Sequence, residues 1–182
     1  MSKKRNFISS LHNSTRRNYV DRMVDNKIFC MKVAKKYGKD YWDGNRKFGY
    51  GGFKYIEGRL TPVAKKLIKN YKLNNNSKIL DVGCGKGYLL FEIKKILPGI
   101  KIVGIDISNY ALQNSKKEIK KFLYKFKAQD KYKYKSKYFD LVISMGTLHN
   151  LGISDLSKSI SEIERVGKKK YIMVESFRND QE

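Results

Sequence analysis

Short apolar runs alternate along this chain with longer segments in which apolar residues recur at helical spacing. The runs predict strands at about 78–82, 102–105, 123–128, 139–144 and 171–175. The periodic segments predict helices at about 19–37, 61–71, 89–97, 109–122 and 154–166. Strands that alternate with helices form βαβ units, so the pattern predicts an α/β protein with a parallel sheet of about five strands and helices on both faces.

Several helix ends carry sequence signals of their own. Gly38 is expected to close the first helix. Thr61 is expected to cap the second helix through its hydroxyl, with Pro62 at the first helical position. Ser108 or Asn109 is expected to cap the helix that comes after the second strand.

The composition divides the chain into two regions. Residues 1–60 comprise a basic segment expected to be a mobile arm (1–18), the first helix, and a segment in which glycines alternate with aromatic residues (38–58). Aromatic rings are not left in water without partners, so this last segment is an ordered loop. Its composition fits a lid over a site and a small aromatic core equally well. Residues 61–182 carry all five predicted strands and form the core domain.

The formal charge is +23, which invites a nucleic-acid partner, but the lysines are spread over nearly every segment. A solvated lysine-rich surface is therefore favoured over a dedicated nucleic-acid groove. No apolar run reaches the ~20 residues of a membrane span, and no signal peptide is visible. Cys30 and Cys84 make no disulfide framework, so we expect a reduced, cytoplasmic protein.

Residues 79–90 are the most informative stretch of the chain. An apolar strand ends in a turn with Gly83, Gly85 and Gly87, and a helical pattern begins directly after it. Glycines allow the backbone to approach a ligand closely, and in α/β proteins the end of the first strand binds nucleotide-like cofactors. The dinucleotide fingerprint would need its third glycine at Tyr88, so the turn reads G-x-G-x-G instead.

The stretch from Asp81 to Gly87 resembles motif I of the class I S-adenosylmethionine-dependent methyltransferases. Asp106, at the end of the second strand, matches the acidic residue that this family uses on the ribose hydroxyls, and 139–144 matches its fourth strand. The resemblance covers about residues 60–176. It implies a Rossmann-like sheet in the strand order 3-2-1-4-5 and S-adenosyl-L-methionine as the cofactor.

The cofactor-binding candidates come from the resemblance and from their chemistry. Asp106 would accept both ribose hydroxyls, although it could be a helix cap, and Ile107 offers an apolar surface to the adenine. Gln129 or Asp130 could bind the adenine edge, or both are ordinary loop residues. By the resemblance, Asp81 fixes the turn or meets the cofactor's ammonium. The full set is Asp81, Gly83, Cys84, Gly85, Gly87, Asp106, Ile107, Gln129, Asp130 and Ser144.

Methyl transfer asks for alignment and, with a hydroxyl or ammonium acceptor, for a base. His149, just beyond the fourth strand, is the best-placed base, with a structural hydrogen bond as the alternative role; Glu175 is the second candidate. If the aromatic loop is a lid, its substrate-binding residues are Tyr50, Tyr55 and Arg59. No metal site is predicted.

The segment directly after the fourth strand bears on the identity of the acceptor. Amino-directed nucleic-acid methyltransferases carry Asn/Asp-Pro-Pro-aromatic there, whereas this chain has Ser-Met-Gly-Thr at 144–147 and no cysteine for pyrimidine chemistry. A small-molecule acceptor is therefore favoured. The alternatives are an RNA methyltransferase, motivated by the charge, and a binding protein without catalysis.

The chain ends at Glu182, soon after the fifth strand, whereas family members continue with a helix and two more strands. The resemblance therefore predicts that the C-terminal hairpin is missing and that the edge of strand five is open. Three explanations are open: a naturally short protein, a fragment of a longer one, or a homodimer or partner that covers this edge. The N-terminal region could compensate in part.

Overall fold

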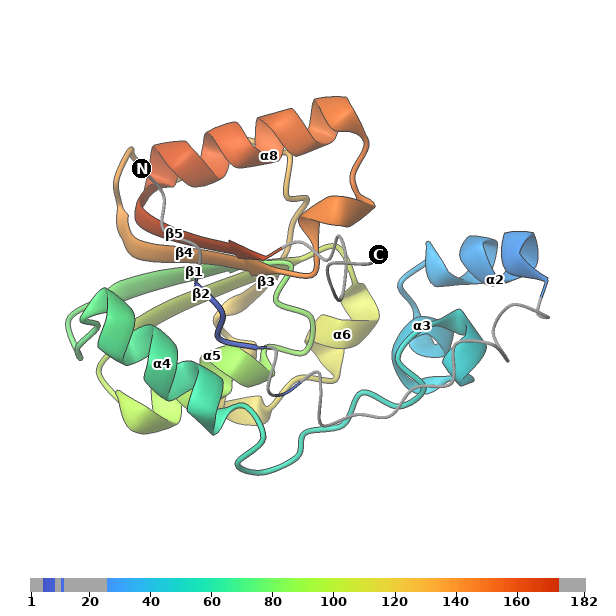
Figure 1. The fold of residues 1–182 in the computed structure, drawn as a ribbon, viewed down its shortest axis with the longest axis horizontal. Coiled ribbons are helices and arrows are strands. Elements are labelled where there is room, and N and C mark those ends of the chain that lie inside the picture. Colours follow the sequence, from blue (N-terminus) through green and yellow to red (C-terminus); the bar gives the residue numbers. More distant parts are fainter. Residues whose placement is uncertain (1–4, 9–10, 12–25, 174–182) are drawn as a thin grey trace.

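Residues 5–8, 11 and 26–173 are described in the computed structural model of this chain (Figure 1). They form a five-stranded sheet in the order β3-β2-β1-β4-β5, in which every neighbouring pair of strands is parallel. The predicted Rossmann-like sheet and its strand order are confirmed. The strands are β1 (Lys78–Val82), β2 (Lys101–Asp106), β3 (Leu123–Lys125), β4 (Phe139–Met145) and β5 (Gly167–Met173).

The fifth strand differs from the prediction at its start. It begins at Gly167 rather than at Tyr171, and the predicted end at Glu175 lies outside the described residues. Lysines at 168–170 conceal this part of the strand in the sequence pattern. An edge strand tolerates them, because it pairs on one side only and charge discourages further pairing.

Helices cover both faces of the sheet (Figure 1). On one face α4, α5 and α7 contribute to a core cluster that contains Leu67, Leu90 and Ile119, while α8 on the other face contributes Ile163 and Val166. No helix in the described part of the chain has the length and apolar character needed to cross a membrane. The core helices are α4 (Thr61–Tyr71), α5 (Tyr88–Ile96), α6 (Asn109–Gln113), α7 (Lys117–Lys120) and α8 (Ile153–Val166).

The predicted single helix at 109–122 is wrong, since the chain forms α6 and α7 with a break between them. The break falls at Asn114 and Ser115. The Asn114 amide side chain donates to the Tyr110 carbonyl, and the Ser115 hydroxyl donates to the Leu112 carbonyl at 2.7 Å. Short polar side chains that bond to nearby backbone groups compete with helix continuation.

The two predicted helix caps have different outcomes. Ser108 caps α6, because its hydroxyl accepts a hydrogen bond from the Ala111 amide at 3.0 Å. Thr61 does not cap α4; the N-cap position is Leu60, and the Thr61 hydroxyl donates to the carboxylate of Glu92. Glu92 is 2% exposed. A hydrogen bond to a charged carboxylate is stronger than a bond between neutral groups, so the Thr61 hydroxyl stabilises the protein more at Glu92 than it would as a helix cap.

In the described part of the N-terminal region lie the helices α2 (Lys27–Ala34) and α3 (Lys39–Asp43) and the 3-10 turn η1 (Arg46–Phe48). The predicted helix at 19–37 is thus observed in part, since 19–25 lie outside the described residues. It ends at Ala34, and Gly38 is the N-cap of α3 instead of closing the first helix.

Part of the predicted mobile arm belongs to the core. Phe7 and Ile8 are each 6% exposed and pack with the cluster on the α4 face. The Phe7 ring lies 4.9 Å from the ring of Tyr171 and 6.5 Å from that of Tyr71, measured between centroids. The prediction of a mobile arm is wrong for this segment, because two apolar residues in a basic stretch cover the sheet beside the edge strand.

Replacing Phe7 by Ala is expected to lower the free energy of unfolding by about 3 kcal/mol, because buried ring contacts are lost and a cavity remains. Urea denaturation followed by circular dichroism measures the change. Ile153→Ala is the control, since this side chain is 89% exposed at the start of α8 and should cost less than about 0.5 kcal/mol. Equal stability of the Phe7 variant and the wild type would contradict a structural role for this segment.

Candidate cofactor and acceptor site

The glycine turn between β1 and α5 adopts a conformation that side chains resist. Gly83, Gly85 and Gly87 have φ values of +81°, +56° and +70°. The amides of Gly83 and Cys84 donate to the Ile105 carbonyl at 2.8 and 3.0 Å, which joins the turn to the end of β2. A Cβ atom at Gly83 would lie 1.9 Å from the Thr147 hydroxyl oxygen, so the close approach of the segment after β4 also demands glycine there.

Asp106 connects this turn to the segment after β2. One carboxylate oxygen accepts from the Gly85 amide at 2.7 Å, and the other accepts from the Ser108 amide at 2.7 Å. The pKa of Asp106 is raised, because the effect of burial is larger than the opposing effect of these backbone hydrogen bonds. Because Ser108 is the cap of α6, the helix-cap role considered for Asp106 is already filled. The carboxylate can still accept further hydrogen bonds at the cavity that it lines.

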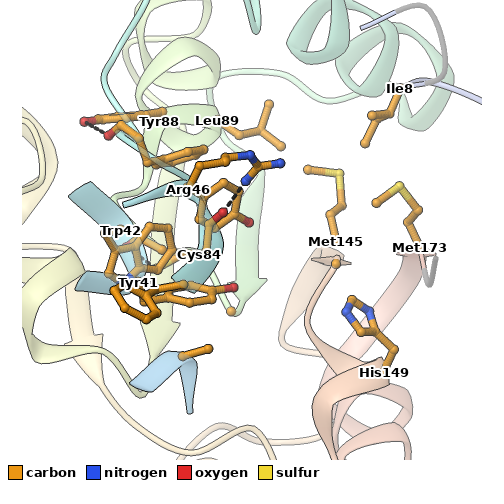
Figure 2. A pocket seen from close by; sticks show the side chains of 18 of the residues that line it. Ile8, Tyr41, Trp42, Arg46, Cys84, Tyr88, Leu89, Met145, His149 and Met173 are labelled. Carbon is orange, nitrogen blue, oxygen red and sulfur yellow. Dashed lines mark hydrogen bonds between the residues drawn. The ribbon is translucent and has the colours of Figure 1, made fainter. Parts of the chain in front are cut away.

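Two adjoining cavities open at the carboxyl ends of the strands. The smaller, of about 190 Å³, is lined by Asp106, Ile107 and Gln129. The larger, of about 730 Å³, is lined by Asp81 and His149 among others, and Figure 2 shows His149 across from Tyr41 and Trp42. The residues that line both are Tyr41, Trp42, Tyr50, Gly83, Met145 and Gly146. The cavities therefore meet beside the glycine turn.

Most of the predicted cofactor residues lie at this junction of strand ends. Gly83, Cys84 and Gly85 line the larger cavity, as does Asp81. Ile107 lies in the smaller cavity, where its side chain is 48% exposed.

The remaining predicted residues have other positions. Gly87 lines neither cavity, and its Cα faces Ile119 and Leu123 of the core. Asp130 is exposed and lines neither cavity. Ser144 is fully buried, and its hydroxyl donates to the Val82 carbonyl at 2.9 Å.

Only some of the predicted catalytic and substrate-binding residues line a cavity. His149 and Tyr50 line the larger cavity. Tyr55 lines neither cavity and donates to Glu92, and Arg59 is exposed and lines neither. Glu175 lies outside the described residues.

Asp81 is a strongly perturbed acid in the site. It is 4% exposed, and burial together with the nearby charge of Asp106 raises the pKa of Asp81 to about 8. Asp81 lines the larger cavity. A buried carboxyl at a cavity wall suits a cationic group, whose charge would favour the carboxylate.

The aromatic loop lies directly on the glycine turn. The Trp42 ring is so close to Gly85 that a Cβ atom there would lie 2.7 Å from it. The indole nitrogen of Trp42 donates to the Ser108 hydroxyl at 2.8 Å. Sequence reasoning missed this contact, since the two residues are 66 positions apart, and only the aromatic content of the loop hinted at it.

An ion pair fastens the same loop a second time. The ammonium of Lys86, within the glycine turn, lies 2.7 Å from a carboxylate oxygen of Asp43, and the Tyr110 hydroxyl donates to that oxygen at 2.8 Å. The side chain of Lys86 is only 4% exposed. Sequence reasoning missed both members of this pair; a lysine between two glycines of the turn was the available signal.

The sequence profile of a family described as a methyltransferase domain matches residues 73–182, which include β1, the glycine turn and Asp106. This chain belongs to the methyltransferase-domain family. The match begins just before β1 and spans the whole sheet, so the methyltransferase domain is the part of the chain that carries the floor of both cavities.

Relatives and solved structures agree with this assignment. The ribosomal RNA small subunit methyltransferase C of Buchnera aphidicola from Acyrthosiphon pisum is 32% identical over 113 residues, 60% of this chain and 32% of the relative. Its counterpart from Cinara cedri Buchnera is 35% identical over 103 residues, 56% of this chain and 29% of the relative. The chain thus spans about a third of the length of the curated relatives it matches.

The fold is shared with proteins of low sequence identity. The PH0226 protein of Pyrococcus horikoshii superposes with a TM-score of 0.54 at 23% identity, covering 74% of this chain and 62% of that one. A Methanococcus maripaludis protein assigned to the S-adenosyl-L-methionine-dependent methyltransferases has a TM-score of 0.53 at 17% identity, covering 94% and 66%.

The cofactor of the methyltransferase domain is S-adenosyl-L-methionine, and the residues at the two cavities fit it. The carboxylate of Asp106 suits a ribose edge, and the buried carboxyl of Asp81 suits the ammonium of the methionine moiety. The glycine turn between these two carboxyl groups has no side chains beyond Cα at its three glycines, so the cofactor can approach the backbone closely there.

Replacing Asp106 by Ala is expected to weaken cofactor affinity about tenfold to a hundredfold, because charge-assisted hydrogen bonds are lost and the turn loses an anchor. Isothermal titration with S-adenosyl-L-methionine measures this. Asp140→Ala is the matched control, because this carboxylate pairs with Lys168 at the opposite end of the sheet and should leave the affinity unchanged. An unaltered affinity of the Asp106 variant would refute the ribose role.

Cofactor binding near pH 6.5 is expected to release about one proton from Asp81, because its pKa in the free protein is about 8 and an adjacent ammonium lowers it. Affinity should therefore rise with pH up to about 8. Calorimetric titrations in buffers of different ionisation enthalpy count the released protons. Asp81→Asn should abolish the release; equal proton counts in variant and wild type would contradict the pairing.

Proposed function

We propose that this chain transfers the methyl group of S-adenosyl-L-methionine to a small-molecule acceptor bound in the larger cavity. The observation that carries the proposal is that this cavity, which contains Asp81, shares Gly83 and Met145 with the smaller cavity, where Asp106 is expected to bind the ribose. Its volume of about 730 Å³ lies within the usual range of small-molecule sites, roughly 300–1,000 Å³.

The cavity offers the alignment that methyl transfer requires. The cofactor supplies a methyl group already activated by its sulfonium, so the protein's task is to hold an acceptor in line and to exclude water. Aromatic walls from the loop, including Trp42 and Phe53, and the methionines Met145 and Met173 supply an apolar enclosure. His149 faces this space from the opposite wall (Figure 2) and is the proposed base that takes the acceptor's proton.

A small-molecule acceptor is favoured over a nucleobase by the stretch that runs from the end of β4 into the following turn. The Ser-Met-Gly-Thr stretch at 144–147 has no side-chain amide or proline pair of the kind that amino-directed nucleic-acid methyltransferases carry. Here Ser144 is buried, and Thr147 donates to the Gly83 carbonyl at 3.4 Å. Both side chains therefore support the glycine turn instead of facing an acceptor.

RNA is the second candidate acceptor, and two observations favour it. The curated relatives are named as ribosomal RNA methyltransferases. In addition, exposed lysines at 131, 133 and 135 alternate with Tyr132 and Tyr134 on a fixed loop. Arg165 donates to the carbonyls of both tyrosines at 3.0 and 2.6 Å, which holds the loop in place. Such a lysine stripe suits a phosphate backbone.

The deciding experiment is incubation with methyl-labelled S-adenosyl-L-methionine and either a size-filtered metabolite extract or total RNA. Label in a small molecule is the expected result. Label confined to RNA, with a steep decrease at higher salt, would replace the proposal by the RNA reading. Cofactor binding without any transfer would favour a binding protein that lacks catalysis.

In the same assay, His149→Ala is expected to lower turnover about a hundredfold while cofactor affinity stays unchanged, because a general base acts on the acceptor alone. Ile153→Ala is the control and should leave turnover unchanged, since this nearby side chain is exposed and lines neither cavity. Unchanged turnover of the His149 variant would leave this residue with a structural role.

A further inference from the structure

The larger cavity has a basic side. Of the described residues that line it, Lys27, Arg46 and Lys47 are lysine or arginine, and Asp81 is the one acidic residue. Lys27 begins α2, and Arg46 and Lys47 begin η1. We call these three basic residues the cationic rim.

Packing between α2 and η1 brings the members of the cationic rim to one place, although they are far apart in the sequence. The ring of Phe29 in α2 meets the ring of Phe48 in η1 edge to face, with centroids 5.8 Å apart and planes at 74°. The Asn45 side chain accepts from the Lys47 amide at 3.0 Å and so fixes the start of η1. The rim therefore belongs to two elements that pack against each other.

Arg46 has a defined place in this cavity. Its side chain extends into the space between Trp42 and Met145 (Figure 2). The stem lies against Gly51, where a Cβ atom would lie 2.8 Å from the Arg46 Cδ, and one terminal nitrogen donates to the Gly49 carbonyl. A guanidinium carries five donors in a planar fork, so it can hold a carbonyl and bind an oxyanion together.

The two lysines add charge that the described part of the cavity does not balance. Neither Lys27 nor Lys47 forms an ion pair with another described residue. The Lys47 ammonium lies 5.2 Å from the centre of the Phe48 ring. An ammonium on a flexible stem can turn toward an anion, whereas Asp81 is expected to pair with the ammonium of the cofactor.

The cofactor's own carboxylate suits a different position. In S-adenosyl-L-methionine it is attached to the same carbon atom as the ammonium, so it belongs near Asp81, which is 4% exposed. Lys27 and Arg46, by contrast, are exposed, and Lys47 is half-buried, which is typical of the mouth of a cavity. A single carboxylate also balances only one of three cations. The cationic rim therefore suits the anion of a second molecule.

The lining around the rim is largely apolar. From α2 come Cys30, Met31 and Ala34, and the core contributes Leu89 and Met173. A molecule that fits this side of the cavity combines an apolar body with an anionic end.

We propose that the acceptor carries an oxyanion, a carboxylate or a phosphate, which the cationic rim binds while the apolar part of the acceptor lies deeper in the cavity. This rests on the proposed function, because it assumes that the same cavity holds the acceptor. With the anion held at the rim, the other end of the acceptor is turned toward the cofactor, and such orientation is what alignment with the sulfonium methyl requires.

The first test separates a size-filtered metabolite extract on an anion-exchange resin near neutral pH. Each fraction is incubated with the full chain and methyl-labelled S-adenosyl-L-methionine. Acceptor activity is expected in the retained, anionic fraction.

The second test titrates that fraction against single variants. Arg46→Gln is expected to raise the amount needed for half-maximal transfer about tenfold, and Lys47→Gln about twofold to fivefold, with cofactor affinity unchanged. Arg46→Lys, which keeps the charge but loses the fork, should lie between Arg46→Gln and the wild type. Lys32→Gln is the matched control, because Lys32 is an exposed residue of α2 that lines neither cavity. Thermal unfolding of each variant verifies its fold.

A third measurement identifies the anion. Trp42 lines the larger cavity and is the only tryptophan of the chain, so its fluorescence reports on binding there. The probes are phenylacetate, phenyl phosphate and the neutral phenylacetamide, added to protein saturated with S-adenosyl-L-homocysteine. At least one anion is expected to bind about fivefold more tightly than the amide, and the tighter of the two anions names the group.

The outcomes separate this inference from the proposed function. Acceptor activity confined to the unretained fraction, or equal affinities for the amide and both anions, overturns the inference while small-molecule transfer stands. A loss of cofactor affinity in Arg46→Gln without a change in the acceptor titration also overturns it, because the rim then binds the cofactor's carboxylate. Label confined to RNA, or no label in any fraction, overturns both.

Discussion

The pair of hydrogen bonds that the Asp106 carboxylate accepts holds the site together. One comes from the Gly85 amide and the other from the Ser108 amide, so a single side chain joins the end of β2, the glycine turn and the start of α6. Ser108 extends the connection, since its hydroxyl accepts from Trp42 and donates to the Tyr37 carbonyl at 2.6 Å. The N-terminal aromatic loop is thereby tied to the residue that is expected to bind the ribose.

The loop's second attachment has a different physical character. Lys86 and Asp43 form an ion pair that is largely removed from water, with the Phe53 carbonyl and the Tyr110 hydroxyl completing the hydrogen bonds. Such a pair adds little net stability, yet removing one partner leaves the other as an unpaired buried charge. It therefore favours one position of the loop on the turn, and the walls of both cavities depend on that position.

Two groups of lysines, one on the edge strand β5 and one on the loop before β4, are clustered, in addition to the lysines spread over the surface. Lysines at 168–170 occupy the edge strand, where like charges oppose pairing with a second copy. Lysines at 131–135 belong to a loop that is fastened to α8, where Arg165 and Glu162 form an ion pair of 2.6 Å. A homodimer or a partner at the strand-five edge stays a prediction, as does the role of the lysine stripe.

The sequence by itself determined the strands, the glycine turn and the position of Asp106, because these depend on local patterns: apolar runs, turn glycines and residues that come directly after a strand. The strand order was predicted from the resemblance of these motifs to a known family, since no local pattern says which strands pair. The sequence did not predict the features that depend on contacts between distant segments, or on local hydrogen bonds that hydrophobic patterns do not reveal. The break between α6 and α7, the start of β5 and the burial of Phe7 arise from local polar bonds, edge position and packing against Tyr171. Only the tertiary structure decided that Trp42 lies on Gly85 and that the aromatic loop forms a wall of the cofactor crevice, since composition shows that rings need partners without showing which partners they find.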